Sequence, residues 1–368
     1  MNINKNKRIV WSIITIIILV VIGCCTVIAF NGQEQAPDNM LHLDTTRTEN
    51  EFYVTEEDYD TTMTKVVEPY LEQYFEDGYF YNNETSLHFQ SYILPDSKRS
   101  IVLSHGFTGY THKLTEMIYY FLRNHYSVYI MEHRGHGYSD RESDDMSLVT
   151  ISDFDDYLED MKVFMDSVVL TSCGDDELYL YAHSMGGGIS VGFLEQYPGY
   201  FKAAVLSTPM LEVNCGMPSF IASTVAKFMI TFGKGDSYLP GQGSFEPVFD
   251  VDDSSAASDA RFQYYSKFQV DDENYQTNGG SYRWLNAAVD FTNEITKKEN
   301  LEKIDIPILM FQAEHDSLVL PGGHYTFANN VESCELVYVE NSKHQIYSAK
   351  DEIFIPYLNT IFSFLEEQ

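Results

Sequence analysis

The sequence predicts an α/β fold, in which a mostly parallel sheet is covered by helices on both faces and interrupted by an inserted cap. Three observations predict it. From Leu87 onward, short apolar runs alternate with stretches of helical periodicity. The alternation stops between Pro209 and Asn300 and then resumes. A serine, Ser184, stands between an apolar strand and a helix, where folds of this kind place reactive side chains.

The first 30 residues predict a membrane anchor. Lys5, Lys7 and Arg8 precede the apolar run Ile9–Phe30, and about 20 apolar residues suffice to cross a bilayer as a helix. The basic flank predicts a cytoplasmic N-terminus and an extracytoplasmic remainder, hence a single-pass protein of the cell membrane. A cleaved signal peptide would have a shorter apolar core. The alternative is a lipoprotein acylated at Cys24, which follows a Val-Ile-Gly stretch.

The rest of the chain divides by composition. Residues 31–57 are polar and acidic and predict a linker between the anchor, residues 1–30, and the domain. Residues 58–208 and 301–368 predict the two parts of the α/β core, and residues 209–300 predict the cap.

The core elements follow from apolar periodicity. The predicted strands are His88–Leu94, Ser100–Leu103, Ser127–Glu132, Glu177–Ala182, Ala203–Ser207, Ile308–Gln312 and Glu335–Val339. The predicted helices are Asp58–Phe75, Lys113–Asn124, Phe154–Leu170, Met185–Gln196, Gly323–Val331 and Ile353–Phe364. Within the cap, Met217–Phe232 is apolar on almost every side, and Tyr282–Ile295 predicts a further helix.

Composition excludes some functions. The formal net charge of -32 disfavours nucleic acid as a partner, because like charges repel, and it is typical of a solvated surface. The cysteines show no CxxC or Cys/His spacing, so no metal site is predicted. A disulfide between Cys173 and Cys215 stays open, because sequence gives no geometry.

The strongest chemical signal is Ala182-His183-Ser184-Met185-Gly186. It matches G-x-S-x-G with alanine in place of the first glycine, and it joins a strand to a helix. Small residues flank the serine in such a turn because its backbone is strained and neighbouring segments press close. The amides of the helix N-terminus favour developing negative charge beside the serine. Ser184 is therefore the predicted nucleophile.

A serine hydroxyl needs a base, and the base needs a carboxylate to orient it. Asp316 follows the strand Ile308–Gln312, and His344 follows the next strand, which gives the chain order serine, acid, histidine. Both groups are expected at the same edge of the sheet. Glu314 is the alternative acid, and His315 and His324 are the alternative bases.

An acyl-transfer site also needs two amide donors for its oxyanion. The backbone N–H of Met185 directly follows the nucleophile and is one predicted donor. The second is the N–H of Phe107, in the His105-Gly106-Phe107 turn after an early strand.

These motifs resemble a known group of proteins. His105-Gly106-Phe107, the segment Glu132–Asp140, the elbow at Ser184 and the late Asp316 and His344 are similar to those of the monoacylglycerol lipase and lysophospholipase α/β-hydrolases. The cap segment Asn278–Trp284 resembles the lysophospholipase L2 branch. The resemblance covers roughly Leu87 to the C-terminus. It implies the α/β-hydrolase fold and hydrolysis of a carboxylic ester with one long acyl chain, without metal or cofactor. Arg134 in this pattern is expected to pair with a carboxylate.

The apolar cap predicts where an acyl chain binds. Each buried methylene contributes about 0.8 kcal/mol, so an apolar lid can hold a lipid chain. Phe220 and Phe228 of the cap, with His105, are the expected substrate contacts. Two other functions stay open: a small-ester esterase or aminopeptidase on the same fold, and an inactive homologue that binds lipid.

Overall fold

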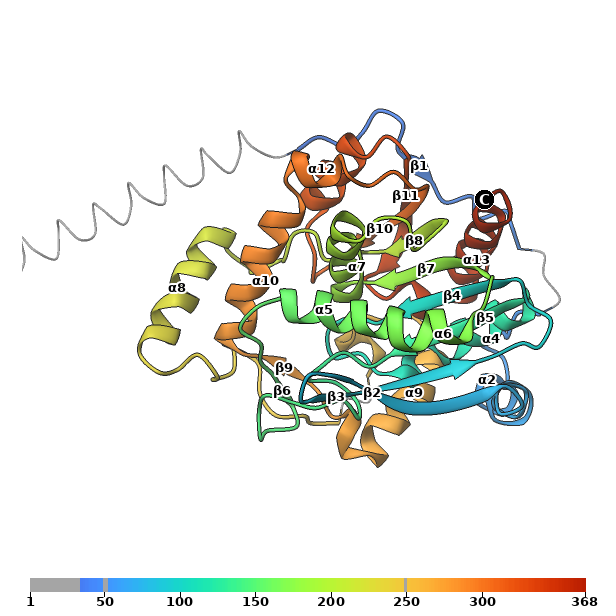
Figure 1. Cartoon of the computed structure of the whole chain (residues 1–368), viewed down its shortest axis with the longest axis horizontal. Helices are drawn as coiled ribbons and strands as arrows, with labels where there is room; N and C mark the ends of the chain where they lie inside the picture. Colours follow the sequence, from blue (N-terminus) through green and yellow to red (C-terminus); the bar gives the residue numbers. More distant parts are fainter. Residues whose placement is uncertain (1–33, 49–51, 248–249) are drawn as a thin grey trace, which may run out of the picture.

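The computed structural model describes residues 34–48, 52–247 and 250–368, and its centre is a nine-stranded sheet (Figure 1). The strand order is β1-β11-β10-β8-β7-β4-β5-β3-β2. The strands are β1 (Leu41–His42), β2 (Phe75–Asn82), β3 (Thr85–Tyr92), β4 (Arg99–Ser104), β5 (Tyr126–Met131), β7 (Glu177–His183), β8 (Ala203–Ser207), β10 (Ile308–His315) and β11 (Cys334–Lys343). A separate pair joins β6 (Leu148–Val149) to β9 (Gly279–Gly280).

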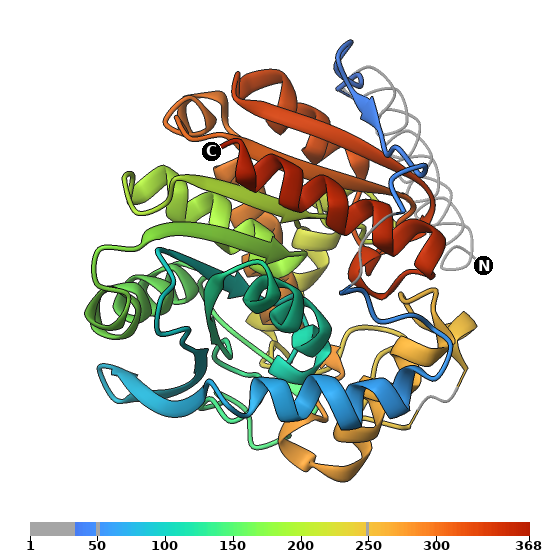
Figure 2. The same ribbon diagram turned by 90° about the vertical axis from the view of Figure 1, so that its right-hand side faces the viewer.

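Helices cover both faces of the sheet, as predicted. Along the central strands, alternate side chains enter opposite apolar layers: Ile101 and Leu103 of β4 face one, and Val102 faces the other. One layer is covered by α2 (Tyr59–Thr62), α3 (Glu68–Leu71), α4 (Thr115–Arg123), α9 (Asp259–Asp271) and α13 (Asp351–Glu366). The other is covered by α5 (Asp155–Phe164), α7 (Met185–Gln196), α10 (Tyr282–Ile295), α11 (Lys298–Leu301) and α12 (Pro321–Asn330). In Figure 2, α13 (red) lies across the near face.

In this spatial order, neighbouring strands from β1 through β5 pair in parallel. The last two pairs, β5 with β3 and β3 with β2, are antiparallel. The sequence did not predict β2. This edge strand alternates weakly, since its first five residues are exposed or half-buried and include Glu76, Asp77 and Gly78. A charged strand at the edge of a sheet lacks the apolar alternation by which strands are recognised.

The segment expected to be a linker packs on the domain. β1 pairs in parallel with β11, and Val54 is buried with its amide donating to the Tyr120 hydroxyl at 2.6 Å. The helix predicted over Asp58–Phe75 spans Tyr59–Leu71, with a π-helical turn, Met63–Val67, between α2 and α3.

The predicted membrane anchor, residues 1–30, lies outside the described residues. Within the described ranges, no helix combines the length and the apolar character that crossing a membrane requires. Cys173, Cys215 and Cys334 are all free thiols in that part of the chain, so Cys173 and Cys215 form no disulfide.

The inserted segment forms two separate lobes. α8 (Ser219–Thr231) packs along α10, which itself covers the sheet beside α7. The helix α9, which the sequence did not predict, lies on the opposite side of the sheet near α2 and the start of α4 (Figure 1). Buried Arg261 fixes α9 there, because its guanidinium pairs with Glu116 of α4 at 2.8 Å.

Candidate active site

Ser184 occupies a sharp turn between β7 and α7. Its backbone has φ 53° and ψ -120°, a left-handed conformation that costs a non-glycine residue energy and is held by its surroundings. The Ser184 amide donates to the Ser207 carbonyl, and its own carbonyl accepts from Gly188 and Met210. These bonds secure the turn on both sides.

The small residues after the serine are required by close packing. A Cβ atom at Gly186 would lie 2.4 Å from the carbonyl oxygen of Ser104, and one at Gly187 would lie 2.6 Å from the Pro209 side chain. Across the turn, a Cβ atom at Gly106 would lie 2.9 Å from that of Ser184. The loop after β4 therefore lies directly against the serine.

His344 and Asp316 form a buried pair at the carboxyl ends of neighbouring strands. Nδ1–H of His344 donates to Oδ2 of Asp316 at 2.6 Å. The other carboxylate oxygen of Asp316 accepts from the amides of Leu318 and Val319. Burial alone would raise the pKa of Asp316, but the His344 bond and these amides outweigh it, so its pKa lies below the ordinary value.

The pair lies beside the serine turn. The His344 ring centroid is 4.9 Å from that of His183, the residue before Ser184, and the His344 carbonyl accepts from the Thr208 hydroxyl at 3.0 Å. Nε2 of His344 is buried and has no hydrogen-bond partner within the described ranges. When one nitrogen of an imidazole binds a carboxylate and the other nitrogen is unpaired, the ring is arranged to accept a proton at the unpaired nitrogen.

The alternative acid and bases lie elsewhere. Glu314 accepts from the Asn341 amide and pairs with exposed His315. His324 is buried, with Nε2 2.8 Å from the Pro209 carbonyl, and burial lowers its pKa to about 4. The structure therefore brings His344 and Asp316 together and leaves the three alternatives apart from them.

The loop after β4 leaves one particular amide available. The Thr108 amide donates to Nε2 of His136 at 3.1 Å, and the Gly109 amide donates to the Gly106 carbonyl at 2.9 Å. The amides of Phe107 and Met185 have no internal acceptor among the described residues. Both predicted oxyanion donors are thus free to bind an external oxygen.

His105 plays a different part from the predicted substrate contact. Its side chain is 2% exposed, Nδ1–H donates to the Gly106 carbonyl at 2.9 Å, and Nε2 accepts from the His133 amide at 3.1 Å. Burial lowers the pKa of His105 to about 4, so the ring is neutral and holds the loop.

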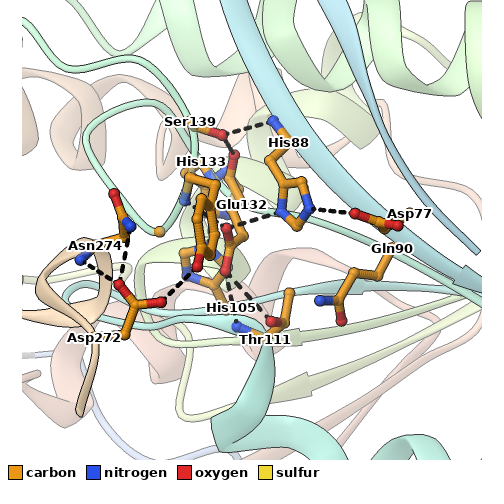
Figure 3. A network of polar contacts seen from close by, with 12 residues as sticks. Asp77, His88, Gln90, His105, Thr111, Glu132, His133, Ser139, Asp272 and Asn274 are labelled. Carbon is orange, nitrogen blue, oxygen red and sulfur yellow. Dashed lines mark hydrogen bonds and ion pairs between the residues drawn. The ribbon is translucent and has the colours of Figure 1, made fainter. Parts of the chain in front are cut away.

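The buried carboxylate of Glu132 also fixes the loop after β4, by accepting from Thr111. The sequence did not predict this role. Glu132 is fully buried and accepts from His88, from the Tyr138 amide and from Thr111 (Figure 3). Burial would raise the pKa of Glu132, but these donors lower it below the ordinary value. Nε2 of His88 lies 3.6 Å from Asp77 at the edge of the sheet. Glu132 falls within a motif quoted above, yet only contacts reveal what it binds.

Arg134 in that turn pairs with a carboxylate, as predicted. Its Nε and Nη2 atoms donate to the two oxygens of Asp160 at 2.6 and 2.7 Å, which is a bidentate geometry. The turn Glu132–Asp140 is thereby fixed to α5 as well as to the loop after β4.

Phe220 and Phe228 lie on the outer face of α8. They are 53% and 60% exposed, and neither lines a described cavity. The structure places these predicted acyl contacts toward solvent, because α8 packs on α10 through small residues, Ala222, Ser223 and Ala226. No group of histidine, cysteine and acidic residues within the described ranges could hold a metal ion.

Comparisons with known proteins agree on one group. The family model "Serine aminopeptidase, S33" (Hydrolase_4) matches residues 95–351. Lysophospholipase L2 of Escherichia coli K12 is 27% identical over 260 residues, covering 68% of this chain and 76% of its own length. Human monoglyceride lipase is 25% identical over 262 residues, covering 70% and 78%.

Solved structures share the fold. A soluble variant of the Saccharomyces cerevisiae monoglyceride lipase superposes with a TM-score of 0.63 at 19% identity, covering 79% of this chain and 94% of its own. A carboxyl esterase from Bacillus coagulans superposes with a TM-score of 0.64 at 20% identity, covering 80% and 98%.

Proposed function

Because the chain belongs to the serine aminopeptidase S33 family of α/β-hydrolases, the group that includes lysophospholipase L2 and the monoglyceride lipases, we propose that it is a serine hydrolase of monoacyl lipid esters. The observation that carries the proposal is the buried His344–Asp316 bond of 2.6 Å beside the strained turn of Ser184. Relatives named as lysophospholipases and as monoglyceride lipases support a glycerol-based ester with one acyl chain.

The proposed reaction follows from the positions of these groups. Oγ of Ser184 attacks the ester carbonyl while Nε2 of His344 takes the hydroxyl proton. The carbonyl oxygen becomes an oxyanion that accepts from the amides of Phe107 and Met185. The C–O bond to the alcohol then breaks, and His344 returns the proton to the leaving oxygen. Water attacks the acyl-serine ester by the same route and releases the fatty acid.

The test is covalent labelling combined with turnover. A fluorophosphonate probe should label the native protein at Ser184 and leave Ser184→Ala unlabelled. Turnover of long monoacyl esters by the variant should fall by roughly four to six orders of magnitude, because no acyl-enzyme forms. Full activity of a clean Ser184→Ala preparation would remove this residue from the reaction. A preference of the native protein for acetyl or butyryl esters would favour the small-ester alternative.

We also propose that the apolar run Ile9–Phe30 tethers the enzyme to the outer face of the cell membrane. The full chain should sediment with membranes and resist alkaline extraction, whereas a truncated chain that begins at Gln33 should remain in solution and keep its activity. Release of the full chain by Cys24→Ala would replace the helical anchor with a lipid attached to that cysteine. Recovery of the unaltered full chain in the soluble fraction would contradict both forms of attachment.

A further inference from the structure

A cleft of about 440 Å³ adjoins the proposed catalytic groups. Its lining includes Thr108 of the loop after β4, Leu318 after Asp316, and Gln345 directly after His344. The facing wall comes from α9, including Tyr265 and Gln269. Because these residues neighbour the proposed oxyanion donor, acid and base in the chain, the cleft is a candidate site for the alcohol portion or the acyl chain of an ester held at Ser184. The lining is largely polar, which suits a headgroup and not a hydrocarbon chain.

Among the described residues that line this cleft, Lys113 is the one basic residue. Its ammonium donates to the Thr108 carbonyl at 3.1 Å and lies 5.1 Å and 5.6 Å from the ring centroids of Tyr110 and Tyr265. An ammonium has three N–H donors, and the described residues supply an acceptor, the Thr108 carbonyl, to one of them. Within the described ranges no carboxylate lies within 4.0 Å of it. The Lys113 ammonium therefore has N–H donors available for a ligand.

A buried carboxylate that shares a cavity with Lys113 does not neutralise it. Glu116 shares a small cavity with it, but both oxygens of Glu116 are occupied by Arg261, and they also accept from the hydroxyls of Tyr59 and Tyr120. Burial lowers the pKa of Lys113 to about 8. A cation that is partly desolvated and unpaired is stabilised when an anionic ligand reaches it.

The Lys113 charge also lies near the reacting groups. Burial is the main cause of the lowered pKa of His183, and the charges of His344 and Lys113 lower it further. His183 precedes Ser184, so the ammonium is within electrostatic reach of the serine turn. Lys343 is not a second candidate, because it donates to the carbonyls of Val251, Asp252 and Ser254 and does not line the cleft.

Acidic residues line the same cleft in a more exposed position. Glu246 and Asp252 are both exposed, whereas Lys113 is half-buried against the loop after β4. The charge is thus positive near the reaction centre and negative toward solvent. The headgroup of a zwitterionic glycerophospholipid has the complementary order, since its phosphate is attached to the glycerol and its ammonium is farther out.

We propose that Lys113 binds the phosphate of a zwitterionic monoacyl phospholipid, whose terminal ammonium faces Glu246 and Asp252. This inference rests on the proposed function, and it names the substrate class of that same site. A neutral monoacylglycerol offers Lys113 no anion, so the cleft discriminates between the two kinds of lipid that the relatives hydrolyse.

The test compares headgroups at one acyl chain. Lysophosphatidylethanolamine and the matching monoacylglycerol are offered as substrates to the native protein, to Lys113→Met and to the charge-preserving control Lys113→Arg. The native kcat/KM should favour the phospholipid, and Lys113→Met should lower the phospholipid-to-monoacylglycerol ratio about 10- to 100-fold, the worth of a charge-assisted hydrogen bond. Lys113→Arg should largely keep the ratio. The native ratio should also fall above about pH 8, as the ammonium loses its proton.

The ratio separates recognition from support of the loop. Because Lys113 also holds the Thr108 carbonyl, a merely structural role would lower turnover of both lipids equally and leave the ratio unchanged. Equal losses, or a native preference for monoacylglycerol, would overturn the proposal. For the outer charges, replacing Glu246→Gln and Asp252→Asn together should abolish a preference for the ethanolamine headgroup over anionic phosphatidylglycerol in its monoacyl form. An unchanged preference would remove the two carboxylates from recognition.

Binding tests the inference without turnover. A monoalkyl ether analogue of lysophosphatidylethanolamine, which has no ester to be hydrolysed at Ser184, should bind the native protein at least tenfold more tightly than it binds Lys113→Met. Equal affinity would overturn the role of Lys113. Tighter native binding in a protein that hydrolyses neither lipid would preserve the phosphate site and refute the proposed hydrolase function alone.

Discussion

The loop after β4 and the cap helix α8 are both expected to meet the substrate, yet they are held in opposite ways. The loop is fixed by directed polar contacts, in which His136 accepts from Thr108, His105 accepts from His133, and Glu132 accepts from Thr111. α8 packs on α10 through small side chains, with a partly buried hydrogen bond from Ser223 to Asn286 and an exposed ion pair.

The different contacts of the loop after β4 and of α8 match the different roles that we propose for them. An oxyanion donor must stand within a few tenths of an ångström of its target, and hydrogen bonds define direction as well as distance. Contacts between small apolar groups are non-directional, so a helix held by them can shift at little cost. The loop is suited to catalysis, and α8 is suited to contact with an irregular lipid surface.

The largest effect should come from His344→Ala, which removes the proposed base. We expect kcat to fall by roughly 10⁴-fold or more, with Asp316→Asn costing less because the imidazole remains. Steady-state kinetics on a soluble short ester measure this directly. His324→Ala is the matched control, since this histidine is equally buried. Loss of activity in the control, with His344→Ala active, would place the base elsewhere.

His136→Phe tests whether one directed bond positions the loop. Without an acceptor for the Thr108 amide, the Phe107 amide should drift, and kcat should fall about 10- to 100-fold with little change in KM. His136→Gln supplies a new acceptor and should recover much of the loss. Thermal unfolding serves as the control, because a drop in kcat that merely follows Tm would indicate a packing defect. Equal kcat for the two variants would contradict a role for the acceptor.

Glu132→Gln tests whether the negative charge of this buried carboxylate stabilises the protein. The native pKa of Glu132 is lowered, so its contribution to stability is full above the unfolded pKa and is lost as the pH falls through the native pKa. We expect the variant to be less stable by about 3 kcal/mol at pH 7, as for a broken buried charge network. The difference from the native protein should shrink in acid. Denaturant titrations from pH 7 to pH 3 measure it, and a constant difference would contradict the ionised state.

The smallest effect is expected from α8. Replacing Phe228 and Phe232 with serine should change stability by less than about 0.5 kcal/mol, because both rings are largely exposed. Turnover of soluble short esters should stay within about threefold, whereas turnover of long-chain lipid in vesicles should fall about tenfold. Thr231→Ser on the same helix is the control. Equal losses on both substrates would show that α8 acts on the catalytic groups.

The sequence predicted those parts of the molecule whose signal is local. The strand, turn and helix around Ser184 follow from apolar periodicity and small residues, and Met185–Gln196 begins and ends where predicted. Asp316 and His344 were placed together because parallel strands end at one edge of a sheet, and the structure joins them. The amides of Phe107 and Met185, the predicted oxyanion donors, have no internal acceptor among the described residues.

Features that depend on distant contacts were not predictable in this way. The sequence of α9 is polar and was interpreted as a loop. The helix is held by buried Arg261, which pairs with Glu116, a residue distant in the sequence, and such a contact leaves no local pattern. The hydrophobicity of Phe220 and Phe228 indicated contact with apolar groups, but it could not say whether they face inward or outward. His105 was expected to contact the substrate, but its ring nitrogens bond to backbone groups of Gly106 and His133. The sequence does not reveal which backbone groups lie beside a side chain.

The short strand β1 bears on self-association of the protein. It pairs with Val337 and Tyr338 of β11, and the Leu43 amide donates to the Tyr338 carbonyl at 3.0 Å. Without this cover, β11 would present an unpaired edge, the surface on which sheets of separate molecules join. A truncated chain that keeps Leu41 and His42 should therefore stay monomeric in concentrated solution, whereas one that begins after Leu43 should self-associate through that edge.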